Sequence, residues 1–127
     1  MKRLPEAELA VMQALWEENR PMSRAKLETR LQNRKWAATT LNTYLTRLVG
    51  KDFLHREKQG KGYTYRPKVQ KTDYLAFESE AVLHHAFGSS LKSFITALAG
   101  TGSLDAKELE EAQRYLQELT GKEHGHE

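Results

Sequence analysis

The chain has 127 residues, of which 39% are hydrophobic and 29% are charged, and its formal net charge is +3. This length suits one domain with at most a small second module, and the absence of cysteine excludes disulfides, thiolate metal sites and cysteine nucleophiles. No apolar run approaches the roughly 18 residues of a membrane span and no signal-peptide core follows the charged start, so we expect a cytoplasmic protein without membrane insertion.

The first predicted helix follows Pro5, whose missing N–H suits the first turn of a helix. Apolar residues then recur at helical spacing and form a broad stripe that ends before Asn19. The stripe consists of Leu9, Met12, Leu15 and Trp16. An aromatic residue at helical spacing packs in a core more often than it anchors a ligand, so we expect a core helix.

A second, short helix is predicted from Arg24 to about Leu31. Ser23 is its expected N-cap, and Ala25, Leu27 and Leu31 are expected to face inward. A polar connector over residues 32–36 ends at Trp36, which we expect to pack on the core, the alternative being a contact with a DNA backbone. Three helices joined by short turns match a helix-turn-helix preceded by one support helix.

The third helix begins near Ala37 or Ala38 and is the centre of the prediction. Leu41, Leu45 and Leu48 recur at i, i+4 and i+7, which makes one face of the helix apolar. The rest of its circumference is largely polar and carries Thr39, Thr40, Asn42, Thr43, Thr46 and Arg47. Such a helix can pack on one side and read a polar surface with the other.

Two strands are predicted after Gly50, on either side of the turn Gln59-Gly60-Lys61-Gly62. Glycine supplies the positive φ that a tight turn needs, and aromatic and threonine residues flank the turn. A polar-faced helix followed by a basic hairpin is typical of a winged helix, in which the helix enters the DNA major groove and the wing lies on phosphates. A solvated helix and hairpin without a partner is the alternative at this point.

The winged-helix interpretation predicts a set of DNA-binding residues. Asparagine pairs well with adenine, threonine offers a hydroxyl and a methyl group, and arginine can contact guanine or a phosphate. We expect Thr40, Asn42 and Thr43 nearest the base edges, an ordinary solvated position being the alternative for each threonine. Arg47 and Lys51 are expected on the DNA backbone. The full predicted set is Thr39, Thr40, Asn42, Thr43, Arg47, Lys51, Arg56, Lys58, Lys61 and Tyr63, with Arg66 as a further phosphate contact.

Three amphipathic helices are predicted after Pro67. The first runs from Thr72 to before Gly88, the second from Leu91 to Gly100, and the third begins at a capping pair formed by Asp105 and Glu108. Their apolar residues are too many to be covered by a small winged helix, so we expect a self-complementary homodimer interface. The predicted dimerisation residues are Leu75, Val82, Phe87, Leu91, Phe94, Ile95, Leu98, Leu109 and Leu116.

The charge of the chain divides near the same place as its helix pattern. Residues 1–71 hold 16 Lys and Arg against 7 Asp and Glu, a net +9, whereas residues 72–127 hold 4 against 10, a net −6. A cationic half suits a polyanion, although a charge run is often only a solvated face. The predicted fold class is therefore mainly α with a small β-wing: a winged helix-turn-helix domain over residues 1–70 and a helical dimerisation region over residues 71–127.

The sequence contains few residue patterns that are typical of catalysis or of cofactor binding. No Ser-His-Asp order, glycine-rich phosphate loop or H-E-x-x-H pattern is present, so we expect no enzyme and no cofactor. His84, His85, His124 and His126 could contribute to a metal site, but adjacent helical residues point apart and a polar tail is the simpler interpretation. We therefore expect no metal.

The sequence resembles the penicillinase-repressor family, which includes methicillin-resistance regulators and copper-responsive repressors. The resemblance covers nearly the whole chain. Its carrying segments are Glu6-Ala7-Glu8-Leu9-Ala10-Val11-Met12 with Leu15-Trp16-Glu17, the helix from Thr39 to Leu48, the wing end Tyr63-Thr64-Tyr65-Arg66-Pro67, and the stretch from Leu104 to Leu116. It implies a homodimer on a palindromic operator in double-stranded DNA that represses genes for antibiotic resistance or metal handling.

The resemblance also implies how repression is relieved. Penicillinase-type repressors lose activity when a membrane sensor peptidase triggers cleavage of an Asn-Phe bond in the dimerisation region. Ala97-Leu98 occupies that place here and is the candidate cleavage position, with Ser93-Phe94 just upstream. Copper-responsive members carry C-terminal cysteines that this chain lacks, so thiolate copper sensing is excluded.

Taken together, the sequence predicts a homodimeric transcriptional repressor that occludes a palindromic operator and controls resistance or stress genes. The alternative is a winged-helix module that binds protein and has no sequence-specific affinity for DNA. A steep dependence of binding on salt would favour the repressor, because phosphate contacts release counterions.

Overall fold

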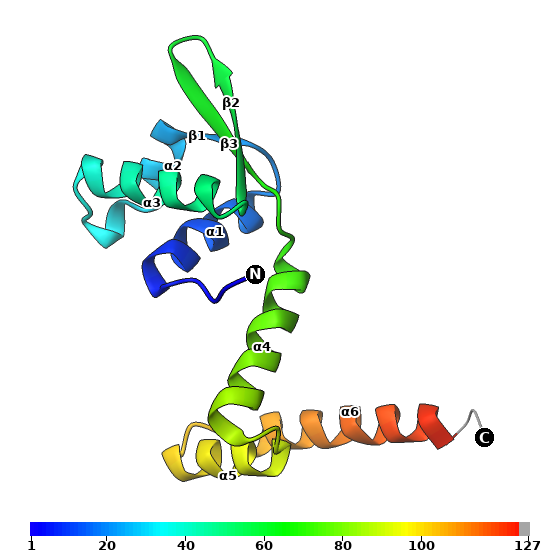
Figure 1. Ribbon diagram of the computed structural model, residues 1–127. Coiled ribbons are helices and arrows are strands. Elements are labelled where there is room, and N and C mark those ends of the chain that lie inside the picture. The colour runs from blue at the N-terminus through cyan, green and yellow to red at the C-terminus, as the bar shows by residue number, and fades with distance from the viewer. Residues whose placement is uncertain (125–127) are drawn as a thin grey trace. The chain divides into compact units, whose positions relative to one another are not determined.

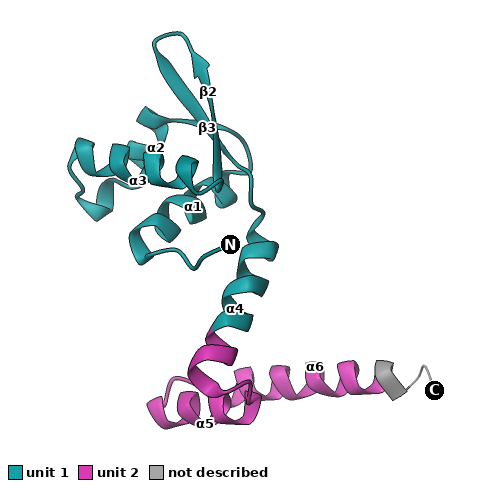
Figure 2. Cartoon of the chain, in the orientation of Figure 1, with its two compact units in different colours: residues 1–81 teal, residues 82–127 magenta. Residues whose placement is uncertain are grey.

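The protein is described by a computed structural model that covers the backbone of residues 1–124 and the side chains of residues 1–121 (Figure 1). In chain order its elements are α1 (Glu6–Glu18), β1 (Met22–Ser23), α2 (Arg24–Arg30), the 3-10 turn η1 (Gln32–Arg34), α3 (Ala38–Gly50), β2 (Leu54–Gln59), β3 (Gly62–Pro67), α4 (Lys71–Phe87), α5 (Leu91–Thr101) and α6 (Ala106–His124). They form two compact units, residues 1–81 and 82–127 (Figure 2). No helix of the described residues is long and apolar enough to cross a membrane.

The core of the first unit lies between α1, α2, α3 and the sheet. As predicted, α3 buries Leu41, Leu45 and Leu48, while α1 contributes Val11, Met12 and Leu15. The Ser23 side chain caps α2 by accepting a hydrogen bond from the Lys26 amide at 3.2 Å, which confirms that prediction. The expected inward position of Ala25 is wrong, because two residues of helix place it about 200° around the axis from buried Leu27.

The predicted hairpin is present as the antiparallel pair β2 and β3, and it extends beyond the helices of its unit as a wing (Figure 1). Gly60 has a φ of 59° at the turn, the conformation for which glycine was expected. A two-residue strand that the sequence did not reveal, β1, pairs with β3 so that Met22 lies opposite Tyr65. This pairing joins the base of the wing to the start of α2.

The first half of α4 belongs to the winged-helix unit, which therefore reaches to Ala81, past residue 70. Tyr74 is 0% exposed and packs edge-on to Phe53 with ring centroids 5.7 Å apart. Its hydroxyl oxygen accepts a hydrogen bond from the Leu4 amide at 2.7 Å, and burial raises the pKa of this phenol. Tyr74 thus ties both the N-terminal segment and α4 to one core.

The second unit consists of the end of α4 together with α5 and α6. Ser90 caps α5 by accepting from the Ser93 amide at 3.1 Å, and Asp105 caps α6 by accepting from the Glu108 amide at 2.8 Å. The predicted end of α5 at Gly100 is wrong, because the left-handed residue that ends the helix is Gly102, with a φ of 75°. Phe87 and Phe94 pack edge-to-face, with ring centroids 5.3 Å apart.

Candidate nucleic-acid interface

The outer face of α3 is polar and open to solvent. Because Leu41, Leu45 and Leu48 point into the core, the residues between them point outward. Thr39, Asn42, Thr43 and Arg47 are exposed, whereas Thr40 is only half-exposed. A shallow hollow of about 370 Å³ lies on this face and is lined by Asn42, Thr43, Thr46 and Arg47.

Two of these polar side chains already have partners within the protein. The Thr43 hydroxyl donates to the Thr39 carbonyl oxygen at 2.9 Å. The amide oxygen of Asn42 accepts a hydrogen bond from Nε of Arg24, which lies on α2. Arg24 was not among the predicted site residues, since nothing in the local pattern of α2 indicates a partner 18 positions away.

Lys51, predicted on the DNA backbone, has an internal partner. Its Nζ lies 2.6 Å from an Oε1 of Glu8, and the Glu8 side chain is 2% exposed. Leaving a buried carboxylate without a partner would destabilise the fold, so the Lys51 ammonium group is held at Glu8 to neutralise its charge. Lys51, which directly follows α3, therefore stays outside the surface proposed below, whereas Arg47 on α3 has no ion-pair partner among the described residues.

The wing gathers cations and two tyrosine rings on one face. Arg56 lies opposite Tyr65 and Lys58 opposite Tyr63 in the hairpin, and directly paired residues share a face. The Arg56 guanidinium stands over the Tyr63 ring, 4.8 Å from its centroid. Lys61 occupies the turn and is exposed, so the predicted cationic wing residues lie along one projecting hairpin.

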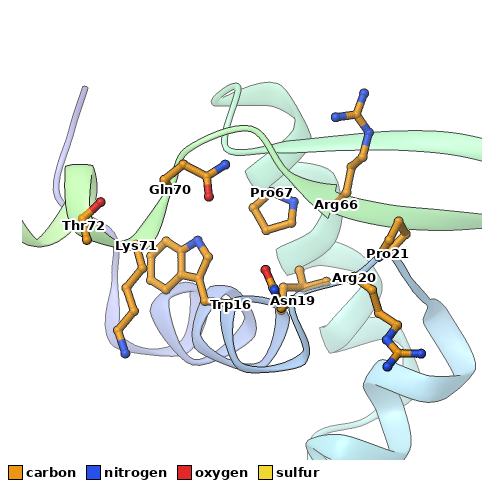
Figure 3. A pocket seen from close by; sticks show the side chains of 10 residues that line it. Trp16, Asn19, Arg20, Pro21, Arg66, Pro67, Gln70, Lys71 and Thr72 are labelled. Atoms are coloured by element: carbon orange, nitrogen blue, oxygen red, sulfur yellow. The ribbon is translucent and has the colours of Figure 1, made fainter.

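A second hollow, of about 390 Å³, lies at the base of the wing between the end of α1 and the start of α4 (Figure 3). The Trp16 indole forms one wall and is fixed by a hydrogen bond from its Nε1 to the Val69 carbonyl oxygen at 3.0 Å. The ionisable side chains that line the hollow are all cationic: Arg20, Arg66 and Lys71. The positive surface of the wing therefore continues to its base.

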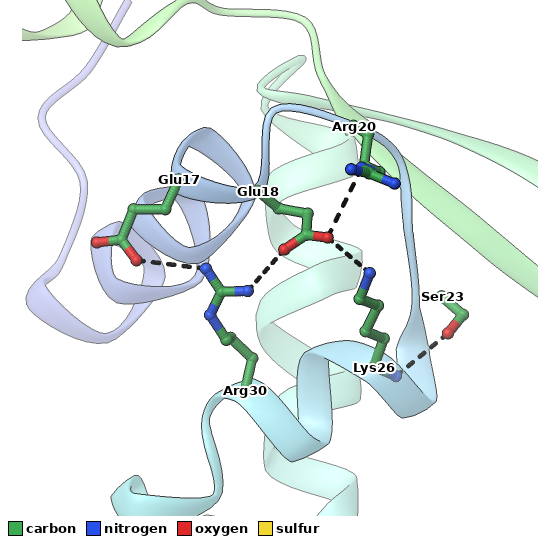
Figure 4. Close-up of polar contacts among 6 residues, drawn as sticks. All are labelled: Glu17, Glu18, Arg20, Ser23, Lys26 and Arg30. Atoms are coloured by element: carbon green, nitrogen blue, oxygen red, sulfur yellow. Dashed lines mark hydrogen bonds and ion pairs between the residues drawn. The ribbon is translucent and has the colours of Figure 1, made fainter.

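Ion pairing leaves most of the unpaired positive charge of residues 1–71 on α3 and the wing. Among these described residues, every carboxylate except that of Glu57 forms an ion pair with a Lys or Arg side chain. The densest cluster surrounds Glu18, which contacts Arg30 at 2.7 Å and Lys26 at 2.6 Å (Figure 4). The cations left without an ion-pair partner within the described part of the chain are Lys2, Lys35, Arg47, Arg56, Lys58, Lys61, Arg66 and Lys71. Most of these lie on α3 or on the wing, where their positive charge is available to attract a polyanion.

The Glu18 cluster gives a pH-dependent prediction. Hydrogen bonds from Lys26 and then Arg30 lower the pKa of Glu18 from 4.5 to about 2. Because the folded-state pKa lies below the unfolded value, the stabilisation is fully present above pH 4.5 and is lost as the pH falls towards 2. We expect Glu18→Gln to lower the melting temperature at pH 7 and to have little effect at pH 2.

The control for this measurement is Glu17→Gln, since Glu17 contacts only Arg30, at 3.6 Å, and its side chain is 66% exposed. Its effect at pH 7 should be smaller than that of Glu18→Gln. Equal melting-temperature losses for the Glu18 variant at pH 7 and pH 2 would contradict the assigned role.

The histidines do not form a metal site within the described side chains, where no group of three or more His, Asp or Glu residues is placed to hold an ion. The His84 and His85 rings pack edge-to-face at 5.2 Å, and His84 Nδ1 lies 3.0 Å from the Ser89 hydroxyl. The side chains of His124 and His126, considered for a tail site, lie outside the described residues.

Comparisons with known proteins find similar repressors. The sequence model of the penicillinase repressors matches residues 4–118. The chain is 26% identical over 121 residues to a penicillinase repressor of Bacillus licheniformis, covering 93% of this chain and 94% of that protein. It is 26% identical over 110 residues to the methicillin resistance regulatory protein MecI of Mammaliicoccus sciuri, covering 87% and 89%. The solution structure of the DNA binding domain of the repressor BlaI is similar, with a TM-score of 0.52 and 29% identity over 58% of this chain and 94% of that domain.

Proposed function

The chain belongs to the penicillinase repressor family and is a DNA-binding transcriptional repressor, and we propose that it acts as a homodimer that occludes a palindromic operator. The observation that carries the DNA-binding part of this proposal is the gathering of cations without ion-pair partners on the wing, together with Arg47 on α3. Each protomer would bind one half-site, and bound protein would block transcription of genes for resistance or stress. The proposed compartment is the cytoplasm.

In this proposal α3 enters the major groove and the wing lies along the neighbouring backbone. The polar face of α3 would meet base edges and the flanking phosphates. The cations of the wing would add affinity but little sequence information. The proposed DNA contacts are Thr39, Thr40, Asn42, Thr43 and Arg47 on α3, and Arg56, Lys58, Lys61, Tyr63 and Arg66 on β2, β3 and the turn between them.

The homodimer is proposed from apolar side chains that the described chain leaves open to solvent. Leu91 is 49% exposed on α5 and Leu109 is 47% exposed on α6. Exposed apolar side chains that gather on neighbouring helices are typical of an interaction surface. A self-complementary contact about a two-fold axis would cover them. The proposed dimerisation residues are Leu75, Val82, Phe87, Leu91, Phe94, Ile95, Leu98, Leu109 and Leu116.

Relief of repression is proposed to act on α5. The candidate cleavage position, Ala97-Leu98, lies inside this helix, with Ala97 exposed and Leu98 half-buried. A peptidase takes its substrate in an extended form, so α5 would have to open locally before cleavage there. We propose that a signal, through a membrane sensor peptidase pathway or another route that destabilises α5, separates the protomers and releases DNA.

The proposed function is tested by equilibrium binding to a palindrome selected from a random DNA pool and to a random duplex. With roughly six to ten phosphate contacts, affinity should fall by about 10³ to 10⁵ between 50 and 200 mM salt. Lys58→Ala and Lys61→Ala should each weaken binding to both duplexes alike and reduce the salt slope by about 1.

The matched control is Lys107→Ala, which removes an exposed lysine from α6 and should leave both affinities and the slope unchanged. If the protein selects no symmetric sequence and its binding does not depend on salt, the alternative function, a winged-helix module for protein partners, is favoured instead.

A further inference from the structure

We propose that Arg24 sets the base preference of α3 by fixing the side-chain amide of Asn42, so that Asn42 reads a keto base, guanine or thymine, and not adenine. The inference rests on the proposed function and concerns the same surface. It departs from the general preference of asparagine for adenine.

The Arg24 guanidinium is held at three points. Its Nε donates to the Asn42 amide oxygen, one terminal nitrogen donates to the Ala38 carbonyl oxygen at 3.0 Å, and the other donates to a Glu28 carboxylate oxygen at 2.6 Å. Ala38 and Asn42 lie on α3, one helical turn apart, and Glu28 lies on α2. Because a guanidinium is planar and rigid, three such bonds fix its orientation and that of its partners.

The chemistry of arginine determines which end of the Asn42 amide faces it. Guanidinium nitrogens only donate hydrogen bonds, so the atom in contact with Nε must be the amide oxygen and not the NH₂ group. Among the described residues no protein acceptor lies within hydrogen-bonding distance of that NH₂ group. Asn42 is exposed and lines the hollow on α3, so the open end of its amide is the donor end.

An amide held in this way favours particular base edges. Asparagine recognises adenine by accepting from N6 and donating to N7 together, which requires oxygen and nitrogen to face the base at once. Here the oxygen faces α2, and the remaining donors match the acceptors of guanine, N7 and O6, or O4 of thymine. Adenine offers the single acceptor N7, but beside it stands the N6 amino donor, which the NH₂ group would oppose. Cytosine presents a donor, its N4 amino group, which the NH₂ group would oppose.

The neighbouring threonine agrees with this selection. Since the Thr43 hydroxyl hydrogen is used by the Thr39 carbonyl, Thr43 can offer a base only its methyl group and its remaining acceptor capacity. A methyl group beside an NH₂ donor suits thymine, which carries a methyl group at C5 and an acceptor at O4. Guanine fits through its two acceptors alone.

The experiment is selection from a random duplex pool with the full-length protein and with the variants Asn42→Ala, Arg24→Ala and Arg24→Lys. The position read by Asn42 is the one at which preference disappears in Asn42→Ala. The unaltered protein should favour guanine or thymine there over adenine by roughly fivefold or more. Arg24→Ala should gain acceptance of adenine at that position alone, because the amide is free to turn. Arg24→Lys should gain it to a smaller extent, because an ammonium group can still donate to the amide oxygen but lacks the rigid planar fork that holds three partners at once.

The matched control is Glu28→Gln, which removes the ion pair of Arg24 but not its contact with Asn42, and should keep the preference. A general loss of affinity in Arg24→Ala neither supports nor contradicts the inference, since the readout is the base selected at one position. Adenine preferred by the unaltered protein at the Asn42 position, or an unchanged preference in both Arg24 variants, would overturn the inference. Failure of every form to select a symmetric sequence would instead refute the proposed function.

Discussion

A chain that ends at Ala81 should remain folded but bind the palindromic operator about 10² to 10⁴ times more weakly than the full chain. It keeps the whole first compact unit, including Tyr74 and Phe77, and thus α3, the wing and their core. It lacks α5 and α6, on which most of the proposed dimer contacts lie. Each half-site would then be bound separately, and the gain from binding two linked half-sites would be lost.

Two controls separate loss of the dimer from loss of the fold. A chain that ends at Lys71 also lacks Tyr74, so it should lose thermal stability as well as affinity. The full-length double variant Ile95→Asp and Leu116→Asp should be monomeric by sedimentation, with the affinity of the chain that ends at Ala81. If the shortened chain binds the palindrome as tightly as the full protein, occlusion by a dimer is wrong.

Tyr74→Ala should destabilise the protein by about 3–5 kcal/mol, in the range measured for large aromatic residues removed from cores. The ring is fully buried and contacts Trp16, Phe53 and Phe77, with centroid separations of 6.0, 5.7 and 6.2 Å. Domains of this size are stable by only about 5–15 kcal/mol, so the change would remove a large part of the total. Urea unfolding at fixed protein concentration measures it.

The variant Tyr74→Phe isolates the hydroxyl from the ring. It should cost about 1–3 kcal/mol, because the buried Leu4 amide would lose its only acceptor among the described residues. Tyr63→Ala on the wing is the control for tyrosine removal in general, since that ring is 39% exposed, and it should have a smaller effect. A Tyr74→Ala variant as stable as Tyr63→Ala would contradict the role of Tyr74 in the core.

Local patterns were sufficient where a single element determines the outcome. The spacing of Leu41, Leu45 and Leu48 predicted the buried face of α3, and Gly60 predicted the turn of the wing. Ser23 predicted the start of α2 because a cap acts within one helical turn. Each of these three features depends on residues only a few positions apart, so a local sequence pattern is enough to predict it.

Contacts between distant residues could not be predicted in the same way. The pairs Arg24 with Asn42 and Lys51 with Glu8 depend on how helices cross, and no single-helix pattern contains that information. The strand β1 is two residues long, too short for any alternation to appear. For the site, the sequence therefore predicted the outward residues of α3 and the wing, while their hydrogen-bond partners required the structure.

The two tryptophans lie in different surroundings of the winged-helix unit. Trp36 packs edge-to-face with Tyr44 of α3 at 5.0 Å and beneath the Arg34 guanidinium, whereas Trp16 lies beside Tyr74 and donates to Val69. As a result, a Trp16→Phe chain keeps one tryptophan, next to α3, and a Trp36→Phe chain keeps one tryptophan, beside the start of α4. Emission from the two chains can follow operator occupancy and the docking of α4 separately, without any attached dye.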